Sequence, residues 1–84
     1  MVTVRSVEAL GGHRLRLRFS DGVVGEVDLR DELRGPVFGP LHDPTYFAGV
    51  RVSRSAGTVV WPNAADIAPE TLHQMVLESL AASA

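Results

Sequence analysis

Apolar and polar residues alternate without a break from residue 13 to residue 19. Leu15, Leu17 and Phe19 share one face of this segment, and three arginines, Arg14, Arg16 and Arg18, share the other. This period of two predicts a β-strand with one buried face. Ser-Asp-Gly at 20–22 is a turn signal, and residues 23–29 alternate again, so the two segments are expected to form a hairpin.

The same alternation predicts the length of the turn. A two-residue turn would place Leu17 opposite Glu26 and would mix buried with exposed side chains. A three-residue turn, with Gly22 in the left-handed conformation, pairs Leu17 with Gly25 and Arg16 with Glu26. We therefore predict the three-residue turn.

The remaining pattern predicts an α+β fold. Further strands are expected at 2–9, 50–53 and 58–61. A helical turn is expected near 44–47, and a helix from residue 70 to about residue 81 buries the stripe Leu72, Met75, Val76 and Leu80. Residues 81–84 are expected to fray. Together these elements predict a small, mostly antiparallel sheet of about five strands with one C-terminal helix packed on it.

The junction between the last strand and this helix carries several local signals. Pro62 cannot donate to a sheet, so the strand should stop after Trp61. Pro69 suits the first turn of a helix, which makes residue 68 the N-cap. Ile67 and Leu72 then occupy the two positions of a hydrophobic staple.

The segment Val60-Trp61-Pro62-Asn63-Ala64-Ala65-Asp66-Ile67-Ala68-Pro69-Glu70-Thr71-Leu72 resembles the signature of a bacterial family, domain of unknown function 2442. Residues 19–22, 27–29 and 35–41 also match its pattern in order, as do Asp43 and Phe47. One departure is Ala64, where such sequences often have Gly.

This resemblance implies an α+β fold related to the amino-terminal part of longer proteins that add a DNA-binding domain. It also implies frequent pairing with a small neighbouring protein, in a toxin–antitoxin-like arrangement. It brings no catalytic residues.

Composition narrows the possible functions. The 84 residues are expected to form a single domain, 1–84, without disulfides or thiolate metal sites, because the chain has no cysteine. The net charge is −2 and no lysine is present, so nucleic-acid binding by this chain alone is not expected. The three arginines at 14, 16 and 18 could contact phosphate, but Glu26 and Asp28 should partly cancel their charge on a solvated sheet face. No signal peptide or membrane-spanning run is present in the sequence, and a cytoplasmic location is the default expectation.

Recognisable reaction chemistry is absent from the sequence. It has no Gly-rich phosphate loop and no spaced nucleophile motif. The histidines at 13, 42 and 73 lack the spacing of metal ligands, so neither a metal nor another cofactor is expected. His42 lies beside Asp43, and Asp66 could approach them in space, which would give a histidine–carboxylate pair for acid–base chemistry. No residue is assigned as catalytic, and an enzyme remains only an alternative.

The sequence therefore favours a non-catalytic protein-interaction module that binds through a sheet edge or the aromatic loop. The expected partner is a protein, either the product of a neighbouring gene in an antitoxin-like pair or a second copy of the chain. The alternative is a small-molecule or weakly enzymatic site near Trp61, Asp66 and the loop 40–47. The candidate ligand- or partner-binding residues are Trp61, Asn63, Asp66, His42, Asp43 and Tyr46.

Overall fold

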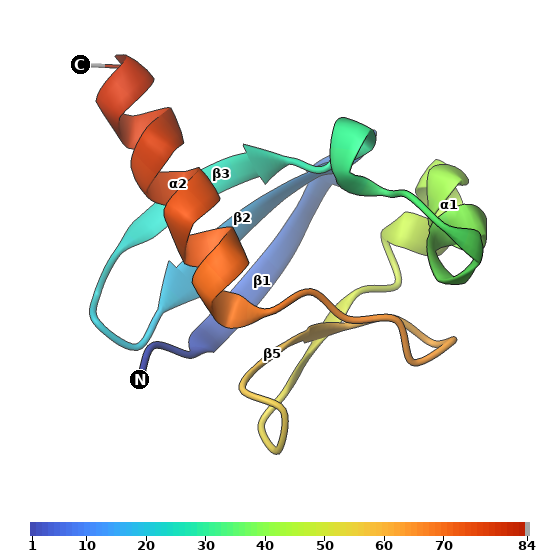
Figure 1. Cartoon of the computed structure of the whole chain (residues 1–84), viewed down its shortest axis with the longest axis horizontal. Coiled ribbons are helices and arrows are strands. Elements are labelled where there is room, and N and C mark those ends of the chain that lie inside the picture. Colours follow the sequence, from blue (N-terminus) through green and yellow to red (C-terminus); the bar gives the residue numbers. More distant parts are fainter. Residues whose placement is uncertain (84) are drawn as a thin grey trace.

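The computed structural model describes residues 1–83, which form two antiparallel sheets, short helical turns and a C-terminal helix (Figure 1). The first sheet has the order β1-β2-β3, and its strands are β1 (Val4–Gly11), β2 (Arg14–Phe19) and β3 (Val24–Asp28). The second sheet pairs β4 (Arg51–Ser53) with β5 (Thr58–Val60). Between the sheets lie the 3-10 helices η1 (Arg30–Glu32) and η2 (Pro36–His42) and the short helix α1 (Pro44–Phe47). The predicted α+β fold, with about five strands and a helical turn near residues 44–47, is confirmed.

The turn between β2 and β3 has the predicted three residues. Leu17 pairs with Gly25 and Arg16 with Glu26, and the Phe19 N–H donates to the Val23 carbonyl oxygen at 2.9 Å. Gly22 has φ +88°, the left-handed conformation that this turn requires. The register was predictable because a two-residue turn would have set buried residues of β2 opposite exposed residues of β3.

Strand β1 lies on the other side of β2 and contains an irregularity near its start. Val4 pairs with Phe19 but Ser6 pairs with Arg18, so Arg5 is an extra residue, a β-bulge. Val4 is buried, whereas Arg5 and Ser6 are both exposed. Beyond the sheet, the Val4 N–H donates to the Gly57 carbonyl oxygen at 2.9 Å, which ties the β4–β5 turn to β1.

The chain leaves β5 through a second three-residue turn, at residues 62–64. The Trp61 N–H donates to the Ala65 carbonyl oxygen, and the Ala64 N–H donates to that of Trp61. Val60 then forms an antiparallel bridge with Asp66. This is the hydrogen-bond pattern of the β2–β3 turn, and Ala64, with φ +68°, occupies the position that Gly22 occupies there. Strand β5 ends at Val60, one residue before the predicted end at Trp61, and the left-handed angle is present although residue 64 is Ala.

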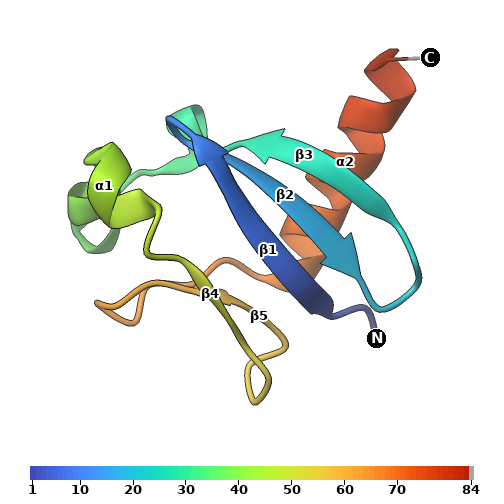
Figure 2. The same ribbon diagram turned by 180° about the vertical axis from the view of Figure 1, so that it is seen from behind.

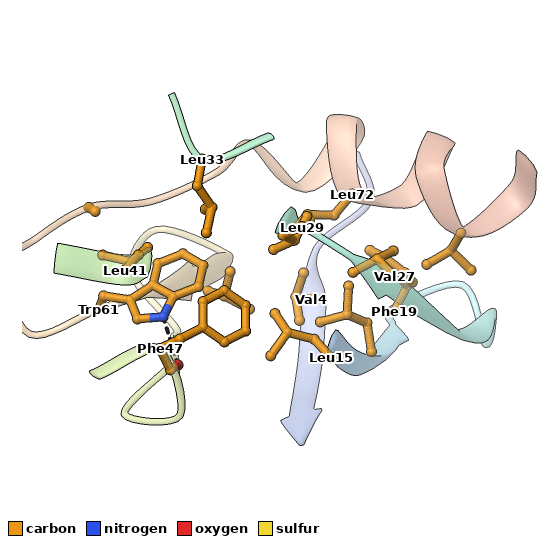
Figure 3. Packing of buried hydrophobic residues seen from close by; sticks show 14 residues of the cluster. Val4, Leu15, Phe19, Val27, Leu29, Leu33, Leu41, Phe47, Trp61 and Leu72 are labelled. Atoms are coloured by element: carbon orange, nitrogen blue, oxygen red, sulfur yellow. Dashed lines mark hydrogen bonds between the residues drawn. The ribbon is translucent and has the colours of Figure 1, made fainter. Parts of the chain in front are cut away.

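The core joins both sheets and the helix. Among the described residues, fourteen apolar side chains form one buried cluster, which Figure 3 shows from close by. Trp61 and Phe47 lie side by side in it, with ring centroids 5.4 Å apart. Because strands, loops and helix all contribute buried side chains, no single element has a core of its own.

Helix α2 (Pro69–Ser83) packs on β3 and covers one face of the three-stranded sheet, while Figure 2 shows the opposite face without a helix in front of it. It begins at Pro69, one residue before the predicted start at residue 70, and the Leu72 N–H donates to the Ala68 carbonyl oxygen, which confirms residue 68 as the N-cap. The expected fraying from residue 81 is wrong for residues 81–83, which are helical, and residue 84 lies outside the described residues.

The prediction that Leu80 is buried with Leu72 and Val76 is also wrong. Leu72 and Val76 are fully buried, but Leu80 is 47% exposed. The physical reason is the position of the helix: its C-terminal end extends past β3, the last strand of the sheet (Figure 1). Leu80 continues the apolar stripe to a place where the sheet supplies no further strand.

Candidate functional site

Trp61, the centre of the predicted small-molecule alternative, is closed to solvent. Its side chain is 1% exposed, and the indole Nε1–H donates to the Phe47 carbonyl oxygen at 2.9 Å (Figure 3). Stacking on a ligand needs an accessible ring face, which this indole lacks. Trp61 instead fixes the segment that leads into α2 against the aromatic loop.

The loop candidates His42, Asp43 and Tyr46 have separate surroundings. The Asp43 carboxylate caps α1 by accepting from the Thr45 N–H at 2.9 Å. The main-chain oxygen of His42 accepts from the His13 Nε2–H at 3.0 Å, while the His42 side chain is exposed. Tyr46 is half-buried against the core. These contacts hold the loop on the sheet.

Asn63 and Asp66 belong to the second three-residue turn. The Asn63 Oδ1 accepts from the Ala65 N–H at 3.1 Å, and Asp66 is exposed beside its bridge partner Val60. Among residues 1–83, no hydrogen bond or ion pair joins the side chains of His42, Asp43 and Asp66, and no group of three His, Asp or Glu side chains could hold a metal ion. The structure thus does not bring the predicted acid–base residues together.

The open edge of β3 has the features of a binding surface. Phe19 donates to Val23, and the Leu29 N–H donates to the His13 carbonyl oxygen at 2.9 Å. In an antiparallel ladder these bonds alternate, so the main-chain groups of residues 24, 26 and 28 point away from β2. No strand within residues 1–83 pairs with that side.

Exposed apolar side chains gather around this edge. Val24, on β3 itself, is 48% exposed, and α2 adds Leu77 at 40% and Leu80 at 47%. Leu80 lies above Gly25, because a β-carbon there would stand 3.8 Å from Leu80 Cγ. We call Val24, Glu26, Asp28, Leu77 and Leu80 the β3 edge. The sequence shows that these positions are apolar. Because Leu80 was predicted to lie in the core, sequence reasoning missed this surface.

The charges on the open sheet face are partly compensated, as predicted for Glu26, whereas Asp28 forms no ion pair within residues 1–83 and its Oδ1 accepts from the Arg30 N–H at 3.0 Å. Arg14 and Arg16 form ion pairs with Glu26, and Arg16 also lies 3.5 Å from Glu8. Hydrogen bonds from Arg16 and then Arg14 lower the pKa of Glu26 below its usual value. Because these side chains are exposed, each pair contributes little to stability, but together they neutralise this half of the face.

Within residues 1–83, no helix combines the length and the apolar character needed to cross a membrane.

Comparison with known proteins places the chain in a family. The family described as "Protein of unknown function (DUF2442)" matches residues 4–74. Among solved structures, the crystal structure of a "Putative DNA Binding Protein" from Nitrosomonas europaea ATCC 19718 is similar, with a TM-score of 0.82 and 33% sequence identity over 96% of this chain. This chain spans 52% of the length of that protein. No functionally curated protein matches this chain. The resemblance carried by the segment around Trp61 is therefore confirmed: the chain belongs to the DUF2442 family of proteins of unknown function.

Proposed function

We propose that this chain is a non-catalytic protein-interaction module whose β3 edge takes up an extended segment of a partner protein. The observation that carries this proposal is Leu80. Leu80 continues the buried stripe of α2, yet its side chain is 47% exposed. It lies over β3, whose outer edge pairs with no strand within residues 1–83. A strand added beside β3 would fill the space below Leu80 and would complete the sheet under the helix.

The edge offers both affinity and selectivity to such a segment. The outward main-chain groups of residues 24, 26 and 28 would form the hydrogen-bond ladder that holds an added strand. A neighbouring strand lies about 4.8 Å away, within reach of the side chains that surround the edge. Its inward residues would meet Leu80, and its outward residues would meet Val24, Glu26 and Asp28.

The chemistry of the edge favours a different protein over a second copy. Pairing two β3 strands in the register centred on Glu26 would set the two Glu26 carboxylates opposite each other, which is destabilising. A partner strand with apolar residues on one face and basic residues on the other avoids this repulsion. In line with what the family resemblance implies, we propose the product of a neighbouring gene as the partner, in an antitoxin-like pair.

The test is the mass of the assembly in solution. The chain is co-expressed with the product of the adjacent gene, and the purified material is weighed by light scattering after size exclusion. We expect a complex in the wild type, loss of the complex in Leu80→Glu, and retention in Ala81→Glu. Ala81 is the matched control because it is exposed on the same turn and points about 100° away.

Three results would count against the proposal. If the chain forms no complex with the product of the adjacent gene, that product is not its partner. A complex that survives Leu80→Glu would place the interface elsewhere. A dimer of this chain that Leu80→Glu disrupts would assign the edge to a second copy. The antitoxin-like role is tested separately, because it requires that co-expression of this chain rescue growth from the neighbouring product.

A further inference from the structure

A second surface feature lies between the start of β1 and the β4–β5 turn. It is a groove of about 650 Å³. Three arginines from three different segments line it together with four uncharged residues: Arg5, Arg18, Arg54, Thr3, Val4, Val52 and Gly57. We call Arg5, Arg18 and Arg54 with these neighbours the arginine groove.

The backbone builds this groove from ordinary strand irregularities. Because Val4 is buried, alternation along β1 places Arg5 on the exposed face, and the β-bulge keeps the next residue, Ser6, exposed as well. Arg18 is opposite Ser6 in the neighbouring strand. Arg54 belongs to the β4–β5 turn, which the hydrogen bond from Val4 to Gly57 holds against β1. The three side chains are thus placed by main-chain contacts.

The close approach of that turn requires a glycine. Gly57 has φ +69°, and a β-carbon on it would stand 3.0 Å from Thr3 Cγ2. A larger residue would be strained and would push the turn away from β1. The wall of the groove that carries Arg54 therefore has a fixed position relative to Arg5.

The charge of the arginine groove is not compensated. No acidic residue lines it, and within residues 1–83 none of Arg5, Arg18 and Arg54 takes part in an ion pair. The arginines at the other end of the same sheet face are paired with Glu26 and Glu8. The positive charge on this face is therefore concentrated at one end, although the whole chain is acidic.

We propose that the arginine groove is a binding site for a phosphate group. Guanidinium groups match phosphate oxygens with paired N–H donors, and three of them suit an anion with more than one negative charge. The volume lies within the range of sites for small molecules, which accommodates a nucleotide-sized ligand or a short piece of nucleic-acid backbone. Arg18 is the ladder partner of Val24 of the β3 edge, but Leu80 lies over Gly25 on the face that α2 covers, opposite the arginines, so the two sites can be tested separately.

The test measures binding of pyrophosphate to the full chain by calorimetry at constant ionic strength. Two further arms use a single-stranded and a double-stranded oligonucleotide of about ten nucleotides, and a hexaglutamate peptide serves as a carboxylate competitor. The variants are Arg5→Gln, Arg18→Gln and Arg54→Gln. The matched control is Arg51→Gln, which removes the same charge from an exposed position of β4 outside the groove. Circular dichroism checks that each variant folds.

We expect each groove variant to weaken phosphate binding about tenfold, and the control to change it less than twofold, because each variant removes one charge-assisted contact. Tighter binding of an oligonucleotide, with a steep salt dependence, would identify nucleic acid as the source of the phosphate. Tighter binding of pyrophosphate would identify a small ligand. Either result supports the site.

The proposal is overturned if neither pyrophosphate nor an oligonucleotide binds the folded wild type. If Arg51→Gln weakens phosphate binding as much as the groove variants do, the binding is general electrostatic attraction and not a defined site. Binding of hexaglutamate at least as tightly as pyrophosphate would contradict the assignment to phosphate. None of these results depends on the β3 edge, since Leu80→Glu should leave phosphate binding unchanged.

Discussion

Gly25 lies directly beneath Val76, so that a β-carbon on Gly25 would stand 2.5 Å from Val76 Cγ1. Helix α2 meets β3 through the missing side chain, which is a common reason for glycine inside a strand. The approach also brings Leu80 over the edge of the sheet. The contact between Gly25 and Val76 therefore sets the height of the helix above β3 and the depth of the space that we assign to a partner strand.

Gly25→Ala should destabilise the fold by about 1–3 kcal/mol, because the added methyl group overpacks the interface between helix and strand. Chemical denaturation followed by circular dichroism measures the change in the free energy of unfolding. Gly39→Ala is the control, since a β-carbon at residue 39 meets no atom within 4 Å. Equal effects of the two substitutions would show that α2 does not pack as closely as the structure indicates.

Ala64→Gly should stabilise the chain by about 0.5–1 kcal/mol. Ala64 has φ +68°, and an L-residue pays roughly 1–2 kcal/mol for this conformation, of which part is offset because glycine loses more entropy on folding. Gly22→Ala, at the equivalent position of the β2–β3 turn, should destabilise by a similar amount. A destabilising Ala64→Gly would mean that the second turn differs from the first.

The contact between Asp21 and His73 should make stability depend on acid pH. Asp21 Oδ2 lies 2.8 Å from His73 Nε2, and the pKa of Asp21 is lowered by the Val23 N–H and then by His73. A carboxyl whose pKa is lowered in the folded state contributes stability above its unfolded pKa, and this contribution disappears as the pH falls through the folded pKa.

Asp21→Asn isolates this effect because an Asn Oδ1 can still accept from the Val23 N–H, as Asn63 does from Ala65 in the second turn. The melting temperature is measured from about pH 5 to about pH 2, and the other carboxyl groups act equally in both proteins. We expect the wild type to lose more stability than the variant over this range. Parallel curves would show that the pKa of Asp21 is not lowered in the folded state.

Trp61→Phe should destabilise the fold by about 2–4 kcal/mol, because it removes buried volume and the buried hydrogen bond from the indole Nε1–H to the Phe47 carbonyl oxygen. Tyr46→Phe, which changes a half-buried ring of the same loop, should remain within about 0.5 kcal/mol of the wild type. Urea denaturation followed by circular dichroism compares the two. If Trp61→Phe lowers the free energy of unfolding by less than about 1 kcal/mol, the indole is not needed for the fold, and the alternative in which it binds a ligand is favoured.

The register of the first hairpin was predictable because it depends on side chains of the hairpin itself. Of the two- and three-residue turns, only the three-residue turn pairs Leu15 with Val27 and Arg16 with Glu26, so that partners share a face. The start of α2 was predictable for a similar reason, since Pro69 and the staple of Ile67 and Leu72 are local signals.

The binding surfaces could not be read from the sequence, since they depend on where elements end in space. The spacing of Leu80 is that of a buried residue, and its exposure follows only from the place where α2 crosses β3. Arg54 lines the same groove as Arg5 because the Val4 N–H bonds to the Gly57 carbonyl oxygen, a long-range contact that no local pattern indicates. The alternative in which Asp66 approaches His42 required a fold that brings the two segments together; in the structure His42 ends η2, and Asp66 bridges to Val60.

The most direct test of the proposed β3 edge is residue-resolved amide hydrogen exchange, measured by NMR on the free chain and on its complex with the product of the adjacent gene. An added strand would bond to the outward amides of β3, so exchange at Val24, Glu26 and Asp28 should slow by at least about tenfold in the complex. Gly25 and Val27, already bonded to β2, should change much less. Unchanged exchange at Val24, Glu26 and Asp28 in a stable complex would contradict the proposal that this edge recruits the partner.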